Sequence, residues 1–437
     1  MNYTKNMRGF ILLLVIIVSA ASSYGQTPTP GKKQEKSIIY INATVHIGDG
    51  TKVLKGAVGF DNGLISYVGA TPEVRKNLFE EVIDVEGMHI YPGFIAPNST
   101  LGLQEIGSVR ATRDQREVGD INPHIRSLIA FQTESDITTT VRTNGILLGQ
   151  ITPRGSFVGG QSSVVHFDGW NWEDALIRES DGIHVYWPRM YERDHTGKLL
   201  SLKERGLYQK RVEALEECLD QAKAYQNRAN EENIDLRLQA FSKLFKNKMN
   251  LYVHAQTAKQ MTAAISLKRK YNIENMLIVG GRESYLITNL LKENNVGVMV
   301  GRLHDLPWND YDDLDLPYKL PKILQDAGVK WCFENAGDME QMNSRNLPFY
   351  AGTAIAYGLE YEQAVAGLTL NTAEMIGVST KYGSLQVGKS ATLIVSKGDA
   401  LDMMTNNIIF AYIDGRSLEL TNRQIGLYKK YKMKYSN

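Results

Sequence analysis

Apolar and polar residues alternate from about residue 38 to residue 85, and turn-forming residues interrupt the alternation at short intervals. A period of two is typical of strands that bury one face. Asp61, Asn62 and Gly63 separate two apolar stretches, and Asn-Gly between strands is a strong hairpin signal. The pattern predicts a small antiparallel β unit in this part of the chain.

The middle of the chain carries short apolar runs that alternate with helix-length amphipathic segments. Runs that are apolar throughout are typical of parallel strands buried on both faces, and their alternation with helices predicts βα units. Such a series favours a (β/α)8 TIM-like barrel, whose functional side chains follow the carboxyl ends of the strands. The clearest runs are residues 249–255, 276–280, 296–300 and 329–333, and the clearest helical segments are 258–271 and 284–294.

Strand-like alternation returns near residue 383, after a short helical segment that ends at Gly377. We therefore predict an α/β fold with two parts. Residues 93–380 form the barrel, residues 37–92 and 383–420 together form a small β-sandwich, and residues 421–437 form a C-terminal tail.

The first residues have the pattern of a secretory signal peptide. Lys5 and Arg8 precede an apolar run of about 12 residues, and small residues at 23 and 25 fit a cleavage site before Gln26. A bilayer span takes ~20 apolar residues, so no stable membrane span is expected, and a retained anchor is the alternative. We predict a signal peptide over residues 1–25, a flexible Pro-rich leader over 26–36, and a periplasmic or secreted protein.

The net charge argues against nucleic acid as a partner, and the cysteine content argues against a disulfide framework or a cysteine metal site. The formal charge is +1, and removing Lys5 and Arg8 leaves 1 − 2 = −1, so the basic field that nucleic acid requires is missing. Cys218 and Cys332 are far apart and lack metal-site spacing, which favours two free thiols, although a single disulfide stays open.

Three segments carry a family resemblance. Residues 91–100 read Tyr-Pro-Gly-Phe-Ile-Ala-Pro-Asn-Ser-Thr, and residues 368–377 and 383–395 contain T-x-N-x-A and G-S-L-x-x-G-K-x-A patterns. Together they resemble the amidohydrolase superfamily, in the branch related to imidazolonepropionase, over nearly the whole mature chain. Thr392 departs from the aspartate that is usual there. The resemblance implies a metal-dependent hydrolase barrel with a composite β domain beside it.

The positions that hold metal ligands in this family are mostly occupied by other residue types. The resemblance places Asn98 and Thr100 where strand one supplies two histidines, and Gly280 where strand six supplies another. His254 matches the strand-five histidine and is the residual metal ligand. The strand-eight aspartate falls near Asn335, so Asp338 is the nearest aspartate. Because affinity grows with converging ligands, no cofactor is expected as purified, and zinc is expected only if an altered site is active.

Polar residues after the predicted strand ends are the candidates for a small-molecule pocket. Arg302 could hold a ligand carboxylate, or pair with Asp305 or Glu334. Asp338 and His254 are the catalytic candidates. The predicted pocket residues are Asn98, Thr100, Glu105, His254, Gly280, Arg302 and Asn335.

Three hypotheses follow, and they leave it open whether the protein is an enzyme. In the first, an exported amidohydrolase-like protein, nominally a hydrolase of non-peptide carbon–nitrogen bonds, has lost most catalysis and binds a ligand. In the second, an altered metal site hydrolyses cyclic amide or peptide-like substrates. In the third, the chain is a non-catalytic partner subunit of an intact amidohydrolase. Self-association is a further expectation.

Overall fold

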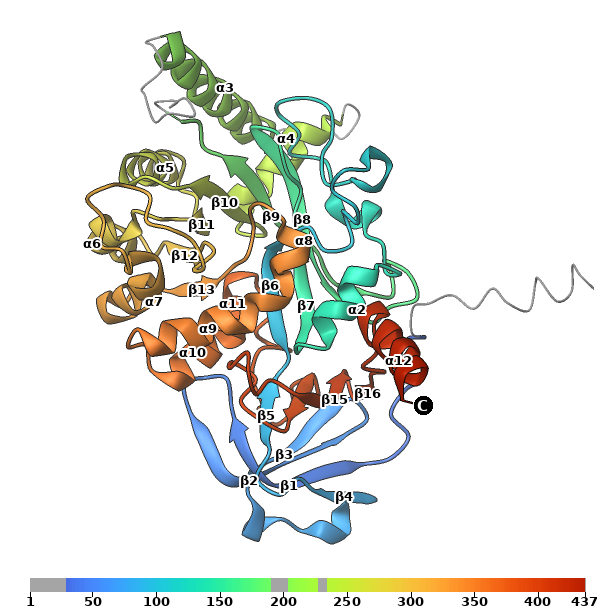
Figure 1. Ribbon diagram of the computed structural model, residues 1–437. Coiled ribbons are helices and arrows are strands. Elements are labelled where there is room, and N and C mark those ends of the chain that lie inside the picture. Colours follow the sequence, from blue (N-terminus) through green and yellow to red (C-terminus); the bar gives the residue numbers. More distant parts are fainter. Residues whose placement is uncertain (1–28, 190–202, 227–233, 437) are drawn as a thin grey trace, which may run out of the picture.

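A computed structural model describes residues 29–189, 203–226 and 234–436. The predicted signal peptide therefore lies outside the described residues. Figure 1 shows two parts, a barrel of strands covered by helices and a second sheet beside it. Both predicted parts of the α/β fold are present.

The barrel strands follow one another in chain order and form a nearly closed sheet. Their continuous apolar sequences are buried on both faces, as in a barrel whose interior is packed with side chains. The strands are β6 (Phe94–Ser99), β7 (Ile146–Ile151), β8 (Val158–His166), β9 (Leu176–Tyr186), β10 (Asn250–Ala255), β11 (Met276–Gly280), β12 (Gly297–Val300) and β13 (Trp331–Phe333).

The third strand differs from a regular βα barrel. β8 runs antiparallel to both β7 and β9, whereas the other neighbouring strands are parallel. The connections at residues 152–157 and 167–175 are too short for the crossover that parallel pairing requires, so the chain turns back as two hairpins.

Helices follow the later strands and cover the outside of the barrel (Figure 1). They begin and end where the sequence supplies caps: Thr257 and Gln260 form a capping box at the start of α5, and Gly328 ends α7 in the left-handed conformation. The helices are α2 (Asp136–Arg142), α3 (Lys203–Gln226), α4 (Leu236–Ser242), α5 (Ala258–Tyr271), α6 (Thr288–Glu293), α7 (Leu316–Ala327), α8 (Glu340–Asn343), α9 (Leu347–Ala356), α10 (Tyr361–Leu368), α11 (Leu370–Met375) and α12 (Arg423–Tyr435).

The second sheet joins the two terminal β segments. β14 pairs antiparallel with β5, so that Leu393 lies opposite Pro92, and the order is β16-β15-β14-β5-β1-β2-β3 with β4 on β1. The predicted hairpin turn at Asn62 and Gly63 connects β2 to β3. The strands are β1 (Ile38–His46), β2 (Lys52–Asp61), β3 (Leu64–Ala70), β4 (Glu81–Asp84), β5 (His89–Pro92), β14 (Leu393–Ser396), β15 (Ile408–Ile413) and β16 (Arg416–Ser417).

The second sheet curls over its own core. Tyr412 of β15 packs against Phe60 of β2 with ring centroids 4.9 Å apart, although three strands separate β15 from β2 along the sheet. The hydroxyl of Tyr412 also lies 2.7 Å from that of Tyr40. Strands from both ends of the chain therefore share one core within a single sheet.

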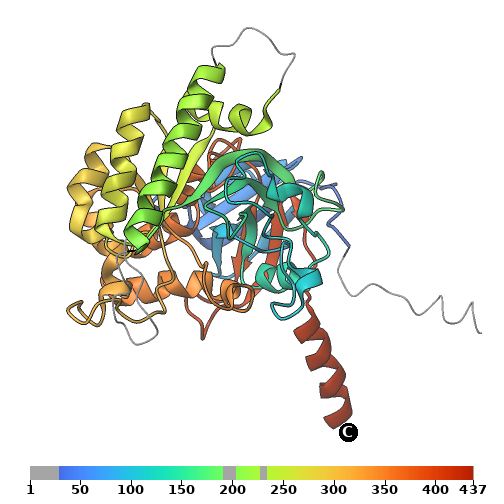
Figure 2. The ribbon, with the colours of Figure 1, turned by 90° about the horizontal axis from the view of Figure 1, so that it is seen from above.

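Two terminal segments complete the described chain. The leader was expected to be flexible, but the Gly31 amide donates to Asp168 at 2.9 Å, so this part of the leader contacts the barrel. The predicted tail forms α12, which projects from the body (Figure 2) and buries none of its residues. Cys218 and Cys332 are free thiols. Among the described helices, none has the length and apolar character to cross a bilayer.

Candidate functional site

A cavity of about 410 Å³ opens at the carboxyl ends of the barrel strands. Asn98 and Thr100 reach it from the end of β6, His254 from β10, and Asp338 from the segment after β13. The structure therefore brings four sequence-predicted residues together at one place, which we call the mouth pocket. Its full lining is Asn98, Thr100, Gln104, Gln115, Arg154, Tyr186, His254 and residues 336–341.

Arg154, which follows β7, is the main charged group of the mouth pocket that the sequence did not indicate. Its Nη1 donates to Asn98 Oδ1 at 2.8 Å, and its Nη2 donates to the Asn98 carbonyl at 2.6 Å. Nη2 also pairs with Glu340 at 3.2 Å. Burial alone would lower the pKa of Arg154, but Glu340 and neighbouring groups raise it, so the guanidinium stays charged.

The backbone conformation of Asn98 allows both of its contacts with Arg154. Its φ of 47° is in the left-handed region, which asparagine tolerates better than most residues. In this conformation its side-chain oxygen and its carbonyl oxygen both face Arg154. No family motif marks this feature, so it could not be found from the sequence.

Two buried glutamates link the first barrel strand to the segment after the last. Glu334 Oε2 accepts from Asn98 Nδ2 at 3.1 Å and from the Ala336 amide at 2.6 Å, and Glu340 Oε1 accepts from the Thr100 amide at 2.7 Å. Burial raises the pKa of Glu334 to about 7, against the opposing effects of its hydrogen bonds and Arg154. These side chains bridge the carboxyl ends of β6 and β13, the two edge strands of the nearly closed sheet.

His254 is fixed by its neighbours. Its Nε2 lies 2.9 Å from His184 Nδ1, and its ring stacks on Tyr186 with a centroid separation of 3.9 Å. Burial lowers the pKa of both histidines well below the ordinary value, so both are neutral near pH 7. No sequence pattern connects His184 with His254, because their contact depends on the pairing of β9 with β10.

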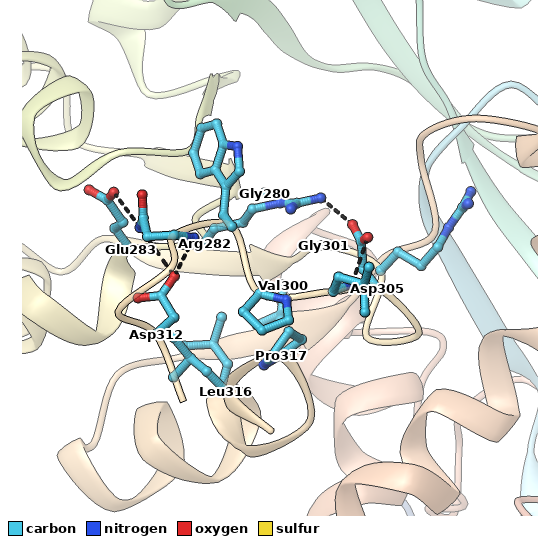
Figure 3. A pocket seen from close by; sticks show the side chains of 15 residues that line it. Gly280, Arg282, Glu283, Val300, Gly301, Asp305, Asp312, Leu316 and Pro317 are labelled. Carbon is cyan, nitrogen blue, oxygen red and sulfur yellow. Dashed lines mark hydrogen bonds and ion pairs between the residues drawn. The ribbon is translucent and has the colours of Figure 1, made fainter. Parts of the chain in front are cut away.

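Four of the predicted pocket residues lie outside the mouth pocket. Gly280 and Arg302 line a separate hollow of about 40 Å³ near the ends of β11 and β12, which has room for water only (Figure 3). Arg302 donates to the carbonyls of Asp338 and Asn335, at 2.9 and 3.2 Å. The carboxylate clamp at Arg302 stays a prediction: each Nη donates one hydrogen bond to a main-chain oxygen, and Arg302 lies outside the mouth pocket.

Asn335 and Glu105 contact other protein groups and do not line the mouth pocket. Asn335 is buried, and its Oδ1 accepts from the Tyr350 hydroxyl at 2.5 Å while its amide donates to Ser344 at 3.3 Å. Glu105 lies in the loop after β6, where its backbone amide donates to Thr112. Burial raises the pKa of Glu105, but it does not line the mouth pocket.

Comparisons with known proteins agree with the fold. A model of the amidohydrolase family matches residues 320–418. The crystal structure of an amidohydrolase from Thermotoga maritima MSB8 superposes with a TM-score of 0.75 and 25% identity, and it covers 88% of this chain and 100% of that chain. The chain belongs to the amidohydrolase superfamily.

Two curated relatives extend this assignment. An amidohydrolase of Hapsidospora irregularis, tasK, is 19% identical over 86% of this chain, and an imidazolonepropionase of Flavobacterium johnsoniae is 28% identical over 32% of it. The chain spans only 40% and 38% of the lengths of these relatives. A molinate hydrolase, 14% identical with a TM-score of 0.54 over 90% of this chain and 96% of that one, shares the fold.

The side chains present do not fit the divalent metal ion that the superfamily implies. Asn98 Oδ1 accepts from the Arg154 cation, and Thr100 Oγ1 accepts from Gln341 Nε2 at 2.8 Å. His254 turns its Nε2 toward His184. Neutral oxygens already bound by protein donors, beside a fixed positive charge, are poor ligands for zinc.

Proposed function

We propose that this amidohydrolase-superfamily protein binds a small organic molecule in the mouth pocket without a divalent metal ion, and that it has lost metal-dependent hydrolysis of carbon–nitrogen bonds. The observation that carries the proposal is the Arg154 guanidinium, which donates to the oxygen at a former ligand position. A metal ion at Asn98 would share that oxygen with a cation, and two cations at such a separation repel each other by several kcal/mol.

The mouth pocket has the size and chemistry of a ligand site. A cavity of about 410 Å³ falls within the range of small-molecule pockets, which is roughly 300–1,000 Å³. His254, Tyr186 and Arg154 offer aromatic surface and polar groups at the carboxyl ends of β10 and β9 and after β7. Their positions are set by strands and by buried hydrogen bonds, so the pocket is formed before any ligand arrives.

Elemental analysis tests the loss of metal binding. The full chain is dialysed against metal-free buffer, exposed to zinc, nickel or manganese, and dialysed again. We expect far less than one ion per chain and no metal-stimulated hydrolysis of simple amides. About one ion per chain that disappears in a His254→Gln variant would overturn the proposal and favour an active hydrolase built around His254 and Asp338.

We also propose export, which the charged, apolar and small residues before Gln26 support. Amino-terminal sequencing of protein recovered from the cell envelope or medium should begin at Gln26. An intact Met1 on that protein would contradict cleavage.

A further inference from the structure

A chain of buried hydrogen bonds runs from the barrel interior to the mouth pocket. Asp181 is fully buried, and its carboxylate accepts from Ser162 Oγ at 2.6 Å, Gln150 Nε2 at 2.6 Å and the Tyr252 hydroxyl at 2.5 Å. Ser162 Oγ lies 2.8 Å from His184 Nε2, and His184 Nδ1 lies 2.9 Å from His254 Nε2. We call this series of hydrogen bonds the Asp181 network. Apart from His184 and His254, its members have no assigned part in the site.

The outer members of the network fix the direction of its hydrogen bonds. Gln150 Oε1 accepts from the Asn98 amide, so its Nε2 is the group that faces Asp181 and must donate. The Tyr252 hydroxyl accepts from Asn250 Nδ2 at 2.8 Å, so its proton is directed to Asp181. Both partners of Asp181 Oδ2 are therefore donors, as an ionised carboxylate requires.

Ser162 extends this order of donors and acceptors from Asp181 to His184. Its hydroxyl donates to Asp181 Oδ1, so its oxygen accepts from His184 Nε2. His184 then carries its proton on Nε2 and accepts at Nδ1, and His254 must donate from Nε2. A neutral His254 with a proton on Nε2 has an unprotonated Nδ1.

The other ring nitrogen of His254, Nδ1, has no hydrogen-bond partner among the described residues. It is also not completely buried, because the described buried side-chain atoms without a partner do not include it. Since His254 lines the cavity, the free nitrogen is available to a bound molecule. Arg154 lines the same cavity and contributes N–H groups.

We propose that the mouth pocket selects a ligand that offers an N–H or O–H donor to His254 Nδ1 beside an acceptor for Arg154, and that Asp181, Ser162 and His184 are positioning residues that enforce this choice. The inference rests on the proposed metal-free ligand site. It specifies which hydrogen-bonding groups the ligand must carry, because a ligand that offers only acceptors leaves His254 Nδ1 unpaired.

Nitrogen NMR of the full chain labelled with 15N-histidine tests the first step. The His254 resonances are assigned by their loss in His254→Gln. We expect Nε2 to carry the proton and Nδ1 to show the shift of an unprotonated ring nitrogen near pH 7. A proton on Nδ1 would overturn the inference whatever the metal content, so this result is separate from a failure of the proposed function.

Paired probes test the selection. Pyrazole offers an N–H beside an acceptor nitrogen, and 1-methylpyrazole keeps the ring and the acceptor nitrogen but carries a methyl group in place of the N–H proton. We expect pyrazole to bind about 5- to 10-fold more tightly and to shift His254 Nδ1, since one hydrogen bond contributes about 1 kcal/mol. Equal affinities, or no binding by either probe, would overturn the proposal.

A matched pair of variants tests the Asp181 network. Asp181→Asn puts an amide where three donors converge, so the preference for pyrazole should disappear and the His254 tautomer should change. Asp399→Asn is the control, because Asp399 also accepts from a tyrosine hydroxyl, Tyr361 at 2.6 Å, but does not line the pocket. It should retain the preference. If Asp181→Asn does not fold, the wild-type tautomer and probe pair still decide the question.

Discussion

The hydrogen bonds of Asn98 make it difficult to restore a metal site by changing this residue alone. It makes four polar contacts: its amide donates to Gln150, its side-chain amide donates to Glu334, and its two oxygens accept from Arg154. A histidine at this position would fit the left-handed backbone less readily than asparagine and would remove the oxygen that accepts from Arg154 Nη1, leaving the guanidinium with Glu340 and the main-chain carbonyl of residue 98. Changing Asn98 alone to histidine therefore removes stability without removing the positive charge.

The buried carboxyl of Glu334 gives a prediction at the same scale. Burial raises its pKa from 4.5 to about 7, so the folded state holds a proton that the unfolded state releases from about pH 4.5. The contribution of protonated Glu334 to the free energy of unfolding is then fully present below about pH 4.5, and it is lost as the pH rises through about 7. Glu334→Gln keeps an oxygen for Asn98 and Ala336 and removes the titration. The stability of the variant relative to wild type should rise by up to about 3 kcal/mol between pH 4.5 and 8.

Urea unfolding at both pH values measures this difference. Glu134→Gln, at an exposed glutamate, is the control and should show little change relative to wild type. A flat profile for Glu334→Gln would mean that Glu334 titrates normally in the folded protein.

At the scale of elements, the sequence predicts those strands and helices whose signals are local. The apolar runs that became β10 to β13 and the hairpin at Asn62 are of this kind. β8 was not predicted, because Gly159, Gly160 and a run of polar residues hide a strand that is buried on both faces. The Arg154 contacts and the Asp181 network could not be predicted, since each depends on pairing between strands distant in sequence.

Gly182 in β9 gives a prediction about strand packing. A Cβ at this position would lie 2.3 Å from the Tyr252 ring and 2.6 Å from the Asn250 carbonyl oxygen of β10. Gly182→Ala must displace the Tyr252 ring or the β10 backbone, and such overpacking costs about 1–3 kcal/mol.

Denaturant unfolding checks the cost, with Gly426→Ala in α12 as the control. No atom lies within 4 Å of a Cβ at Gly426, and alanine favours helix, so stability should not fall. An unchanged stability in Gly182→Ala would show that β9 and β10 are less tightly packed than described.

At the scale of the whole molecule, the two ends of the chain depend on each other. β14 lies between β5 and β15 near the middle of the second sheet, and β5 leads directly into the first barrel strand. Tyr91 of β5 contacts Tyr361 of α10 with hydroxyls 2.9 Å apart. The second sheet is therefore a support for the barrel and not an appendage.

Two truncations test this dependence. A chain that ends after Ser390 loses β14 to β16 and should be insoluble or unfolded, because β5 is left as an open apolar edge. A chain that ends after Thr421 loses only α12, which buries no residue, and should unfold within about 0.5 kcal/mol of the full chain. Solubility and urea unfolding compare the two. A stable, soluble product from the shorter chain would contradict the structural role of β14.

The place of β14 also has a consequence for synthesis. The strand that completes the second sheet leaves the ribosome only after the entire barrel has been made, so β5 waits with one side unpaired throughout translation. Contacts between such distant segments form slowly, and waiting strand edges are sites where nascent chains adhere to one another. Yield in a cell should therefore depend on whatever shields β5 during that interval, and slowing translation before residue 393 should increase aggregation.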